Sequence, residues 1–392
     1  IKCKKIKKRK IMLSNEINKN IKVGLIAPAY KGLTSTFIEL RKNILPFDVL
    51  YIYQNQYRFV SDSGAEDDSV TYYDQMMTFY YHRIRHKKNT CYKQKTLYKI
   101  LKKNRPDVIY AEFGQMGSLV VDSAIKLKIP LIVNFHGYDI HRNDIVEEHF
   151  AQYQKMFKYA HSLVAVSHKM KKRLVDLGAD KNKIHVVPSS PNPIFKYIGN
   201  QGDPLTFLAV GRFVEKKAPH LTILAFNKAL QSNPNLKLRM IGDGPLLNAC
   251  KQLIRSLEIE DSVSLLGYKD NNEVVKEMTN TGAFLQHSVE AYNGDSEGTP
   301  AVLFEAMSCG VPVIVTKHAG LLEVVEHGKD GFLVDEFDIN SMSDYILKLS
   351  QNRELAYKLG QNGIKKVQEQ YNIDLYIQKF HDIITDAINN KK

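Results

Sequence analysis

Two glutamates, Glu297 and Glu305, interrupt an otherwise apolar part of the chain, with seven residues between them. Glu297 stands in a polar loop, whereas Glu305 lies inside the apolar run AVLFEAMSC. A carboxylate on so apolar a run needs a partner, because burying it without one is costly. One interpretation is a salt bridge in the core. The other is a ligand site, since ionised carboxylates accept hydrogen bonds from hydroxyl groups.

The surrounding segment has the pattern strand, loop, helix, strand. Residues 282–288 form an apolar run of strand length, and residues 311–316 are largely β-branched. Between them we expect Thr299 to be the N-cap and Pro300 the first residue of a helix that ends at Gly310. The start of such a helix favours an anion, because its N–H groups and dipole point outward. Carboxylates beside an anion site suit a sugar joined to a phosphate-bearing nucleoside.

The same glutamates stand in EGTPAVLFEAMSCGVPVIVT, which is followed by AGLLEVVEHGKDGFLV. This pattern resembles the signature of retaining nucleotide-sugar glycosyltransferases with the GT-B fold, the large family 4 group. The resemblance implies that Glu297 contacts the hydroxyls of the donor sugar and that Glu305 holds the ribose hydroxyls. It also implies that Gly298, Thr299 and Pro300 lie against the donor.

Two cations follow another predicted strand, which begins at Leu205 and ends at Gly211. Arg212 and Lys217 are five residues apart, so they can converge on one diphosphate, with Arg as a planar fork and Lys as a point charge. Either cation alone is ordinary surface. The stretch GRFVEKK also resembles the diphosphate-binding motif of the family. After the next strands, the resemblance implies that the backbone at Tyr268 meets the nucleobase.

The first half opens with a strand from Ile21, a turn that contains Gly32, and a helix from Phe37. Ligands of doubly wound domains lie at the carboxyl ends of strands. Family members often have paired glycines at this turn, and this chain has Gly32 alone. His136 also falls at a strand end, in FHGYD. A lone histidine is usually structural, but the resemblance places this one near the anomeric centre.

Alternating apolar runs and helical stretches predict the fold. In the first half, further strands are expected at residues 47–54, 107–112, 131–136, 163–167 and 184–188. We expect an α/β protein of the GT-B type, with two Rossmann-like doubly wound domains facing across a cleft. Residues 21–195 would form the acceptor-side domain and residues 203–370 the nucleotide-sugar domain. Residues 371–392 would return to the first domain. Ser189 to Pro193 departs from the family's usual turn at the hinge.

The first eleven residues, IKCKKIKKRKI, hold seven Lys or Arg and no acidic residue. A basic tail for membrane or RNA is one interpretation. We favour another, in which residues 1–20 are a disordered segment whose first part lies upstream of a natural start at Met12. The reason is that Lys-Arg-Lys-Ile-Met is what a purine-rich ribosome-binding site and start codon would encode.

Charge is divided unevenly between the halves: residues 12–202 carry a net charge of +11 and residues 203–392 a net charge of −5. Residues 82–105 contain ten Lys or Arg and no acid. Charges this dense usually have a counter-ion. We favour an anionic membrane surface over a solvated helix face, and we expect no nucleic acid. A cytoplasmic protein, peripheral on the inner face of the cell membrane, fits this distribution.

Composition excludes several other classes. No run of eighteen apolar residues occurs, no signal peptide is visible, and the four cysteines lack metal-site spacing. The chain has no DxD motif, so we expect no metal and no other cofactor. Loss of a nucleoside diphosphate would instead be assisted by Arg212, Lys217 and the helix start at Pro300.

The expected activity is transfer of a sugar from a UDP- or GDP-sugar to a surface glycan or a lipid-linked glycan. An epimerase or hydrolase of nucleotide-sugars on the same fold is the enzymatic alternative. A nucleic-acid-binding protein is the alternative from another class, but it leaves Glu297, Glu305, Arg212 and Lys217 unexplained.

Overall fold

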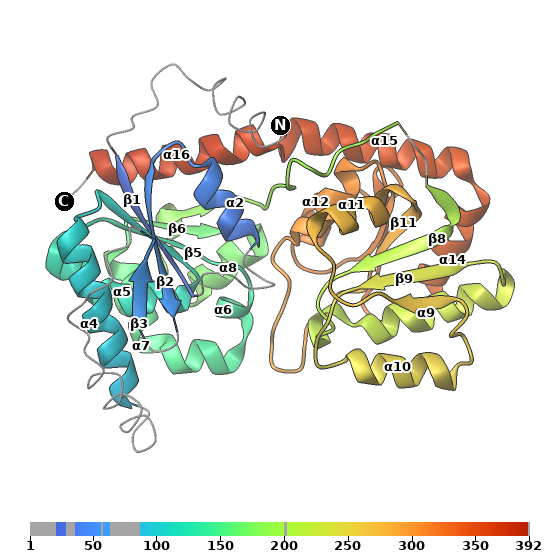
Figure 1. Cartoon of the computed structure of the whole chain (residues 1–392), viewed down its shortest axis with the longest axis horizontal. Coiled ribbons are helices and arrows are strands. Elements are labelled where there is room, and N and C mark those ends of the chain that lie inside the picture. The colour runs from blue at the N-terminus through green and yellow to red at the C-terminus, as the bar shows by residue number, and fades with distance from the viewer. Residues whose placement is uncertain (1–20, 29–35, 56–57, 63–86, 200–201, 391–392) are drawn as a thin grey trace.

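The computed structural model describes residues 21–28, 36–55, 58–62, 87–199 and 202–390. Gly32 and residues 1–20 lie outside this part of the chain, as do residues 82–86 of the basic stretch. The described residues form two sheets, each covered by helices on both faces (Figure 1). The expected doubly wound α/β architecture is confirmed.

The first sheet has the strand order β3-β2-β1-β4-β5-β6-β7. Its strands are β1 Lys22–Ala27, β2 Asp48–Asn55, β3 Arg58–Ser61, β4 Val108–Glu112, β5 Leu131–Asn134, β6 Ser162–Ala165 and β7 Ile184–Val186. All pairs are parallel except β2 with β3, an edge strand that the sequence pattern did not predict. The chain order reverses between β1 and β4, so the carboxyl ends of these strands form a switch point, where ligands bind in this class of fold.

Both faces of the first sheet are buried, which explains why its strands are continuous apolar runs. Along β4, Ile109 and Ala111 face one core, whereas Val108 and Tyr110 face the other. The first core is closed by α4 Lys87–Asn104, α5 Gly114–Leu127, α7 Asn143–Tyr159 and α8 His168–Asp176. The second is closed by α2 Thr36–Ile44 and α16 Ile373–Asn389. A short helix, α6 Tyr138–His141, follows β5.

The second sheet has the strand order β10-β9-β8-β11-β12-β13, and every pair is parallel. Its strands are β8 Asp203–Val210, β9 Lys237–Ile241, β10 Val263–Leu265, β11 Thr281–Gln286, β12 Val313–Thr316 and β13 Gly331–Val334. Its helices are η2 Glu215–Lys217, α9 Pro219–Ser232, α10 Leu247–Ser256, α11 Asn271–Thr279, α12 Ala301–Ser308, α13 Leu321–Val324, α14 Ile339–Gln351 and α15 Arg353–Gln370.

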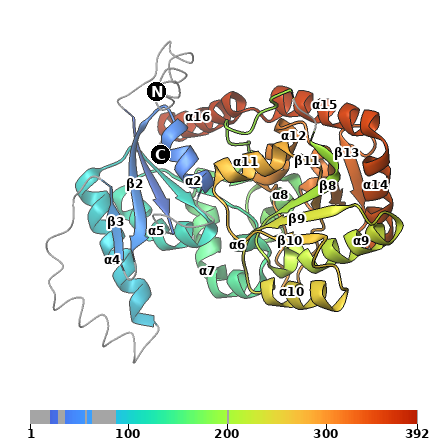
Figure 2. The ribbon, with the colours of Figure 1, turned by 45° about the vertical axis from the view of Figure 1, so that its right-hand side comes forward.

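The chain crosses between the two sheets twice, and the crossings touch. The first crossing is the linker after β7, and the second joins α15 to α16, which run along one side of both domains (Figures 1 and 2). The Ser190 hydroxyl donates to the Tyr371 carbonyl at 3.0 Å, and the Tyr371 ring packs 4.7 Å from that of Phe304. Because α16 packs in the second core of the first domain, the last helix belongs to that domain.

The predicted start of the helix after Glu297 was wrong by one residue. Helix α12 begins at Ala301, and Pro300 is the N-cap, with no side-chain capping bond. Thr299 is not the cap, because its hydroxyl donates to the Val166 carbonyl of the first domain at 2.5 Å. The Thr299 hydroxyl, which local capping rules assign to the start of the helix, thus bonds to the other domain instead.

The composition excluded membrane-spanning and metal-binding proteins, and both classes can be examined in the described residues. None of the helices described here is long and apolar enough to cross a membrane. Cys250 and Cys309 are buried free thiols. Within the described residues no cluster of three or more His, Cys, Asp or Glu side chains has the arrangement of a metal site.

Candidate active site

Lys217 and Glu297 meet at the carboxyl end of the second sheet. Lys217 ends the short helix η2 after β8, and its aliphatic chain passes about 3.5 Å from the position of a Cβ at Gly211. Its Nζ lies 3.3 Å from Oε1 of Glu297, and both side chains are largely buried. Burial lowers the pKa of Lys217, and the Glu297 carboxylate opposes that shift. A desolvated ion pair thus stands where β8 and the loop before α12 converge.

Glu297 is ionised despite its burial. Burial by itself raises the pKa of a carboxyl, but Lys217 and Lys216 together bring the pKa of Glu297 below its ordinary value. Lys216 holds the residues just before Glu297, because its Nζ lies 2.9 Å from Asp295 Oδ1 and 3.3 Å from the Ser296 carbonyl. The loop that carries Glu297 is therefore held by two neighbouring cations.

His318 fixes the backbone of the same loop. Its Nε2 accepts a hydrogen bond from the Glu297 N–H at 3.2 Å, and its Nδ1 lies 2.5 Å from Glu336 Oε1. Because the carboxylate can only accept, the proton of the neutral ring must lie on Nδ1. Glu336 and His318 thus set the position of Glu297 through its main chain, and sequence reasoning did not single them out.

Glu305 lies on α12, about a turn and a half past its start. Burial raises the pKa of Glu305 to about 7, and a hydrogen bond from the Asn192 backbone works against that rise. Among the described residues, Glu305 forms no ion pair, so the alternative of a core salt bridge fails for this part of the chain. The carboxyl group has the desolvated character of a group that hydroxyl donors would stabilise.

Arg212 and Tyr268 lie at the same edge of the sheet and are exposed. Arg212 follows Gly211 and is close enough to Tyr138 of the first domain to lower the pKa of that phenol. Burial and Asp139 outweigh this effect and raise the pKa of Tyr138 to about 12. Tyr268 follows β10 and is 58% exposed. Arg212 therefore faces the first domain, whereas Tyr268 stands on the loop after β10.

The first domain brings His136 against the Glu297 loop. A Cβ placed on Gly137, which has φ +126°, would lie 3.0 Å from the Ser296 carbonyl, and one placed on Gly298 would lie 3.2 Å from the His136 carbonyl. Only glycine permits these two backbones to approach so closely. Residues 136–137 and 296–298 are thus adjacent, although they belong to different domains.

Further hydrogen bonds join the two domains beside this approach. The Ser189 hydroxyl donates to the Thr299 carbonyl at 2.9 Å. The Glu323 carboxylate accepts from the N–H groups of His168 and Lys169, at 2.8 and 3.0 Å, at the start of α8. A carboxylate there also complements the positive end of the helix dipole. Of the candidate donor-site residues proposed from sequence, Gly32 lies outside the described chain and the others are described.

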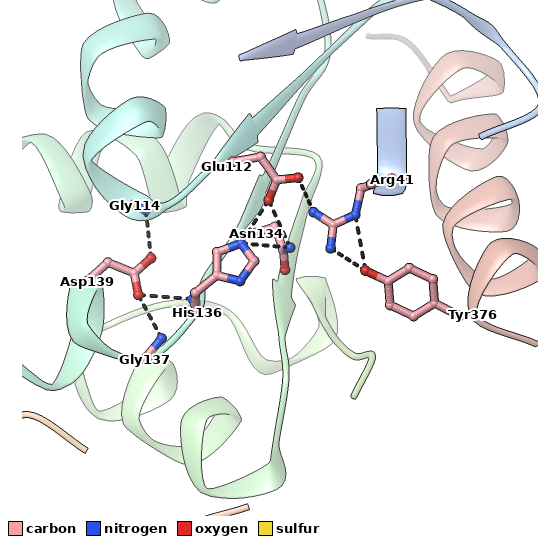
Figure 3. Close-up of polar contacts among 8 residues, drawn as sticks. All are labelled: Arg41, Glu112, Gly114, Asn134, His136, Gly137, Asp139 and Tyr376. Carbon is pink, nitrogen blue, oxygen red and sulfur yellow. Dashed lines mark hydrogen bonds and ion pairs between the residues drawn. The ribbon is translucent and has the colours of Figure 1, made fainter. Parts of the chain in front are cut away.

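His136 itself is held by residues that the sequence did not reveal (Figure 3). Its Nε2 lies 2.8 Å from Oε2 of Glu112 and 3.1 Å from Nδ2 of Asn134. Its backbone N–H donates to Asp139 at 3.0 Å. Asp139 belongs to the quoted FHGYD, so a buried aspartate three residues after the histidine was the signal available in sequence.

Two family models match the chain: Glycosyl transferases group 1 over residues 192–366, and Glycosyltransferase Family 4 over residues 55–190. The amylovoran biosynthesis glycosyltransferase AmsK of Erwinia amylovora is 30% identical over 71% of this chain and 70% of its own. The putative colanic acid biosynthesis glycosyltransferase WcaL of Escherichia coli is 31% identical over 68% of each chain. The protein belongs to the family 4 type of glycosyltransferases.

Solved structures agree with this glycosyltransferase in fold. HepE of Anabaena in complex with UDP has a TM-score of 0.71 at 16% identity, covering 93% of this chain and all of that one. Sucrose-phosphate synthase from Thermosynechococcus elongatus has a TM-score of 0.72 at 16% identity, covering 94% and 99%. The glycosyltransferase therefore has the GT-B fold expected from its sequence.

Proposed function

We propose that this glycosyltransferase moves a sugar from a nucleoside diphosphate-sugar to a glycan acceptor, with retention of the anomeric configuration. The observation that carries the proposal is the buried ion pair of Lys217 with Glu297, between Arg212 and the start of α12. An ammonium and a guanidinium at one strand end suit a diphosphate, and the carboxylate beside them suits the hydroxyls of the attached sugar.

The reaction needs charge stabilisation more than it needs a nucleophile from the protein. When the bond from the anomeric carbon to the β-phosphate breaks, negative charge grows on the phosphate and positive charge on the sugar ring. Lys217, Arg212 and the N–H groups at the start of α12 would stabilise the leaving diphosphate. Glu297 is ionised and fixed, so it would stabilise the cationic ring while the acceptor attacks from the face that the diphosphate leaves.

Glu305 and Tyr268 would bind the nucleoside. Glu305 would accept hydrogen bonds from the ribose hydroxyls, which would stabilise the ionised form of a carboxyl whose pKa burial raises to about 7. Tyr268 would lie beside the base. We favour a uridine nucleotide, since the structure of HepE is a complex with UDP. The names of AmsK and WcaL favour an acceptor in bacterial polysaccharide synthesis.

One experiment tests this function directly. The protein would be incubated with UDP-, GDP- and ADP-sugars, with and without a lipid-linked glycan fraction, and the products followed by NMR. Transfer to the added acceptor with an unchanged anomeric configuration is the expected result. An inverted product would exclude retention. Isomerised donor or free sugar alone would identify the epimerase or hydrolase alternative.

Helix α4 supports a lipid-linked acceptor. It lies at the end of the first domain remote from the second (Figures 1 and 2). Its exposed cations include Lys95, Lys99, Lys102, Lys103 and the adjoining Arg105. Each such side chain near an anionic bilayer contributes about 1 kcal/mol of attraction. We infer that this face brings the enzyme to the inner face of the membrane, where a lipid-linked glycan would be reached.

Vesicle sedimentation checks this part of the proposal. Changing Lys95, Lys102 and Lys103 to Glu should release the protein from anionic vesicles, and rising salt should release the wild type, since the Debye length is about 8 Å at physiological ionic strength. The matched control changes three exposed lysines of the second domain, Lys251, Lys276 and Lys358, to Glu. Equal retention of both variants on the vesicles would show that α4 is a solvated face.

A further inference from the structure

A connected group of buried polar residues occupies the switch point of the first sheet (Figure 3). Glu112 ends β4, Asn134 ends β5, and His136 follows two residues later. Arg41 reaches the group from α2, and Tyr376 reaches it from α16. Glu112 and Asn134 are fully buried, and the His136 side chain is 12% exposed. Such a network at a ligand-binding edge is costly to bury, so its arrangement requires an explanation.

Glu112 is an ionised carboxylate. Burial alone would raise its pKa, but the charge of Arg41 and the hydrogen bond with His136 lower the pKa of Glu112 to about 2. Arg41 forms an ion pair with Oε1 of Glu112, while His136 and Asn134 contact Oε2. The two carboxylate oxygens therefore have separate tasks, one toward the guanidinium and one toward the imidazole.

The contact of His136 with Glu112 determines which ring nitrogen carries the proton. Nε2 lies 2.8 Å from Oε2 of Glu112, and an ionised carboxylate only accepts hydrogen bonds. A lone pair on Nε2 would repel the carboxylate at that distance, so Nε2 must carry hydrogen and donate it. The Asn134 amide donates to the same oxygen at 3.2 Å, beside the imidazole.

The position of the ring is fixed independently. Asp139 is fully buried, and its carboxylate accepts from the N–H groups of His136 and Gly137, at 3.0 and 2.9 Å, and of Gly114 at 2.9 Å. Phe113 adopts a positive φ of 74° at the turn after Glu112, and its ring centroid lies 4.4 Å from that of His136. Asp139 thus holds the main chain, and Phe113 packs beside the ring.

Arg41 connects this arrangement to the end of the chain. Its guanidinium donates to the Tyr376 hydroxyl on α16 and lies 4.6 Å from the centroid of the Phe380 ring. The positive charge of Arg41 balances Glu112, so the pair needs no charge on the imidazole to be neutral. The anchored carboxylate can therefore orient a neutral histidine ring.

We propose that Glu112 is a positioning residue that holds His136 as the Nε2-protonated imidazole, with Arg41 and Tyr376 fixing the carboxylate in turn. This inference rests on the proposed place of His136 at the donor sugar. A fixed tautomer presents one defined polarity to a sugar hydroxyl, and a fixed ring presents it in one direction. Loss of Glu112 would then impair turnover through His136 rather than through binding of the nucleotide.

Long-range ¹H–¹⁵N spectra of the histidine rings test the tautomer without any substrate. At a pH of about 8.5, where an ordinary imidazole is neutral, the wild type should show His136 protonated at Nε2. Glu112→Gln offers both an acceptor and a donor to the ring, so its spectrum should show a mixture of tautomers. His136→Ala identifies the resonance. A wild-type ring protonated at Nδ1 would overturn the proposal.

Steady-state kinetics test the consequence. Glu112→Gln should lower kcat by about 10- to 100-fold and leave the Kd for UDP unchanged. In the His136→Ala background the same change should have almost no further effect, because residues that act through one another are not additive. A full, additive loss in that background would overturn the proposal. A wild-type rate for His136→Ala would instead contradict the proposed role of His136, while the spectra still report on Glu112.

Two further variants separate positioning from folding. Glu112→Gln leaves Arg41 buried without its partner, so the double variant Arg41→Met, Glu112→Gln removes both charges. It should fold and still show the lowered kcat and mixed tautomers. Asp330→Asn breaks another buried ion pair, that with Lys366 in the second domain, and should reduce stability without changing the tautomer of His136. Wild-type kcat in the double variant would overturn the proposal.

Discussion

The carboxyl edges of the two sheets handle charge in opposite ways. At the first edge, Glu112 is matched by Arg41 and His136, and every member is buried or nearly so. At the second edge, Lys217 and Glu297 form a pair, but Arg212 is exposed and Glu305 has no ionic partner among the described residues. The first edge is complete within the protein, whereas the second has groups that a ligand would complete.

This difference indicates how the two domains divide the work. A network whose charges already balance is suited to hold one side chain still, since moving any member would expose an unpaired charge. A set of cations and carboxyls with unmet interactions is suited to bind an ionic, hydroxyl-rich molecule. Experiments that remove single groups from the second edge therefore test binding and turnover, and those at the first edge test geometry.

The largest effect is expected from the cations of the second edge. Lys217→Ala and Arg212→Ala should each lower kcat by about 100-fold or more, the size typical of losing one preorganised electrostatic group. The buried ion pair makes the loss greater for Lys217 than for the exposed Arg212. Initial rates with a saturating donor provide the measurement, and circular dichroism provides the folding control. Wild-type rates in two folded variants would remove these cations from the mechanism.

Substitutions of the two glutamates at the second edge should impair different steps, one nucleotide binding and the other sugar transfer. Glu305→Gln should weaken binding of free UDP by about 10-fold, because a hydrogen bond to a charged group contributes about 1.5–3 kcal/mol. Glu297→Gln should leave that affinity nearly unchanged and lower the rate with intact donor. Calorimetry with UDP and single-turnover rates separate the two. Equal UDP affinities in the two variants would contradict the division between sugar and ribose.

Titration of Glu305 should also make the folding stability depend on pH. Its folded pKa of about 7 lies above the ordinary value of 4.5, so the folded state binds the proton more tightly. Folding stability should therefore fall as pH rises from about 5 to about 8, by up to about 3 kcal/mol from this group. Glu305→Gln should be more stable than the wild type at pH 8 and similar at pH 5, as judged by Tm. An unchanged Tm difference across this range would show that Glu305 titrates normally.

The smallest effect is expected from chelation. If Lys217, Arg212 and the start of α12 stabilise the diphosphate, saturating EDTA should leave transfer unchanged. The comparison is made at fixed ionic strength, with added Mg²⁺ and Mn²⁺ as further arms. Loss of transfer that only a divalent cation restores would replace these side chains with a metal as the main partner of the leaving group.

Much of the fold could be predicted because both faces of each sheet are buried. Strands such as β4 and β12 are then continuous apolar runs, which stand out between helices in the sequence. The exception in the first sheet is β3, a four-residue antiparallel edge strand in which only Phe59 and Ser61 are buried. In the second sheet β13 was also missed, since Gly331–Val334 is short and follows a turn. Short strands carry too little pattern to be recognised alone.

The second edge of the site could be predicted better than the first. Glu297 and Glu305 lie close in sequence, and so do Arg212 and Lys217, so a local pattern includes both pairs. By contrast, Arg41, Glu112, His136 and Tyr376 come together only through the sheet order and the return of α16. The prediction of where α12 starts was wrong for the same reason, because the Thr299 hydroxyl donates to the Val166 carbonyl across the domain boundary.

The return of α16 has a consequence for synthesis of the chain on the ribosome. N-terminal domains generally fold first, as they emerge. Here the second core of the first domain includes Phe380, Ile384 and Ala387, which are made after the whole of the second domain. While residues 203–370 are translated, this face of the first sheet is therefore covered by α2 but not yet by α16. The first domain is completed only when the last helix docks. Only then can Tyr376 contact Arg41, the partner of the Glu112 carboxylate that orients His136.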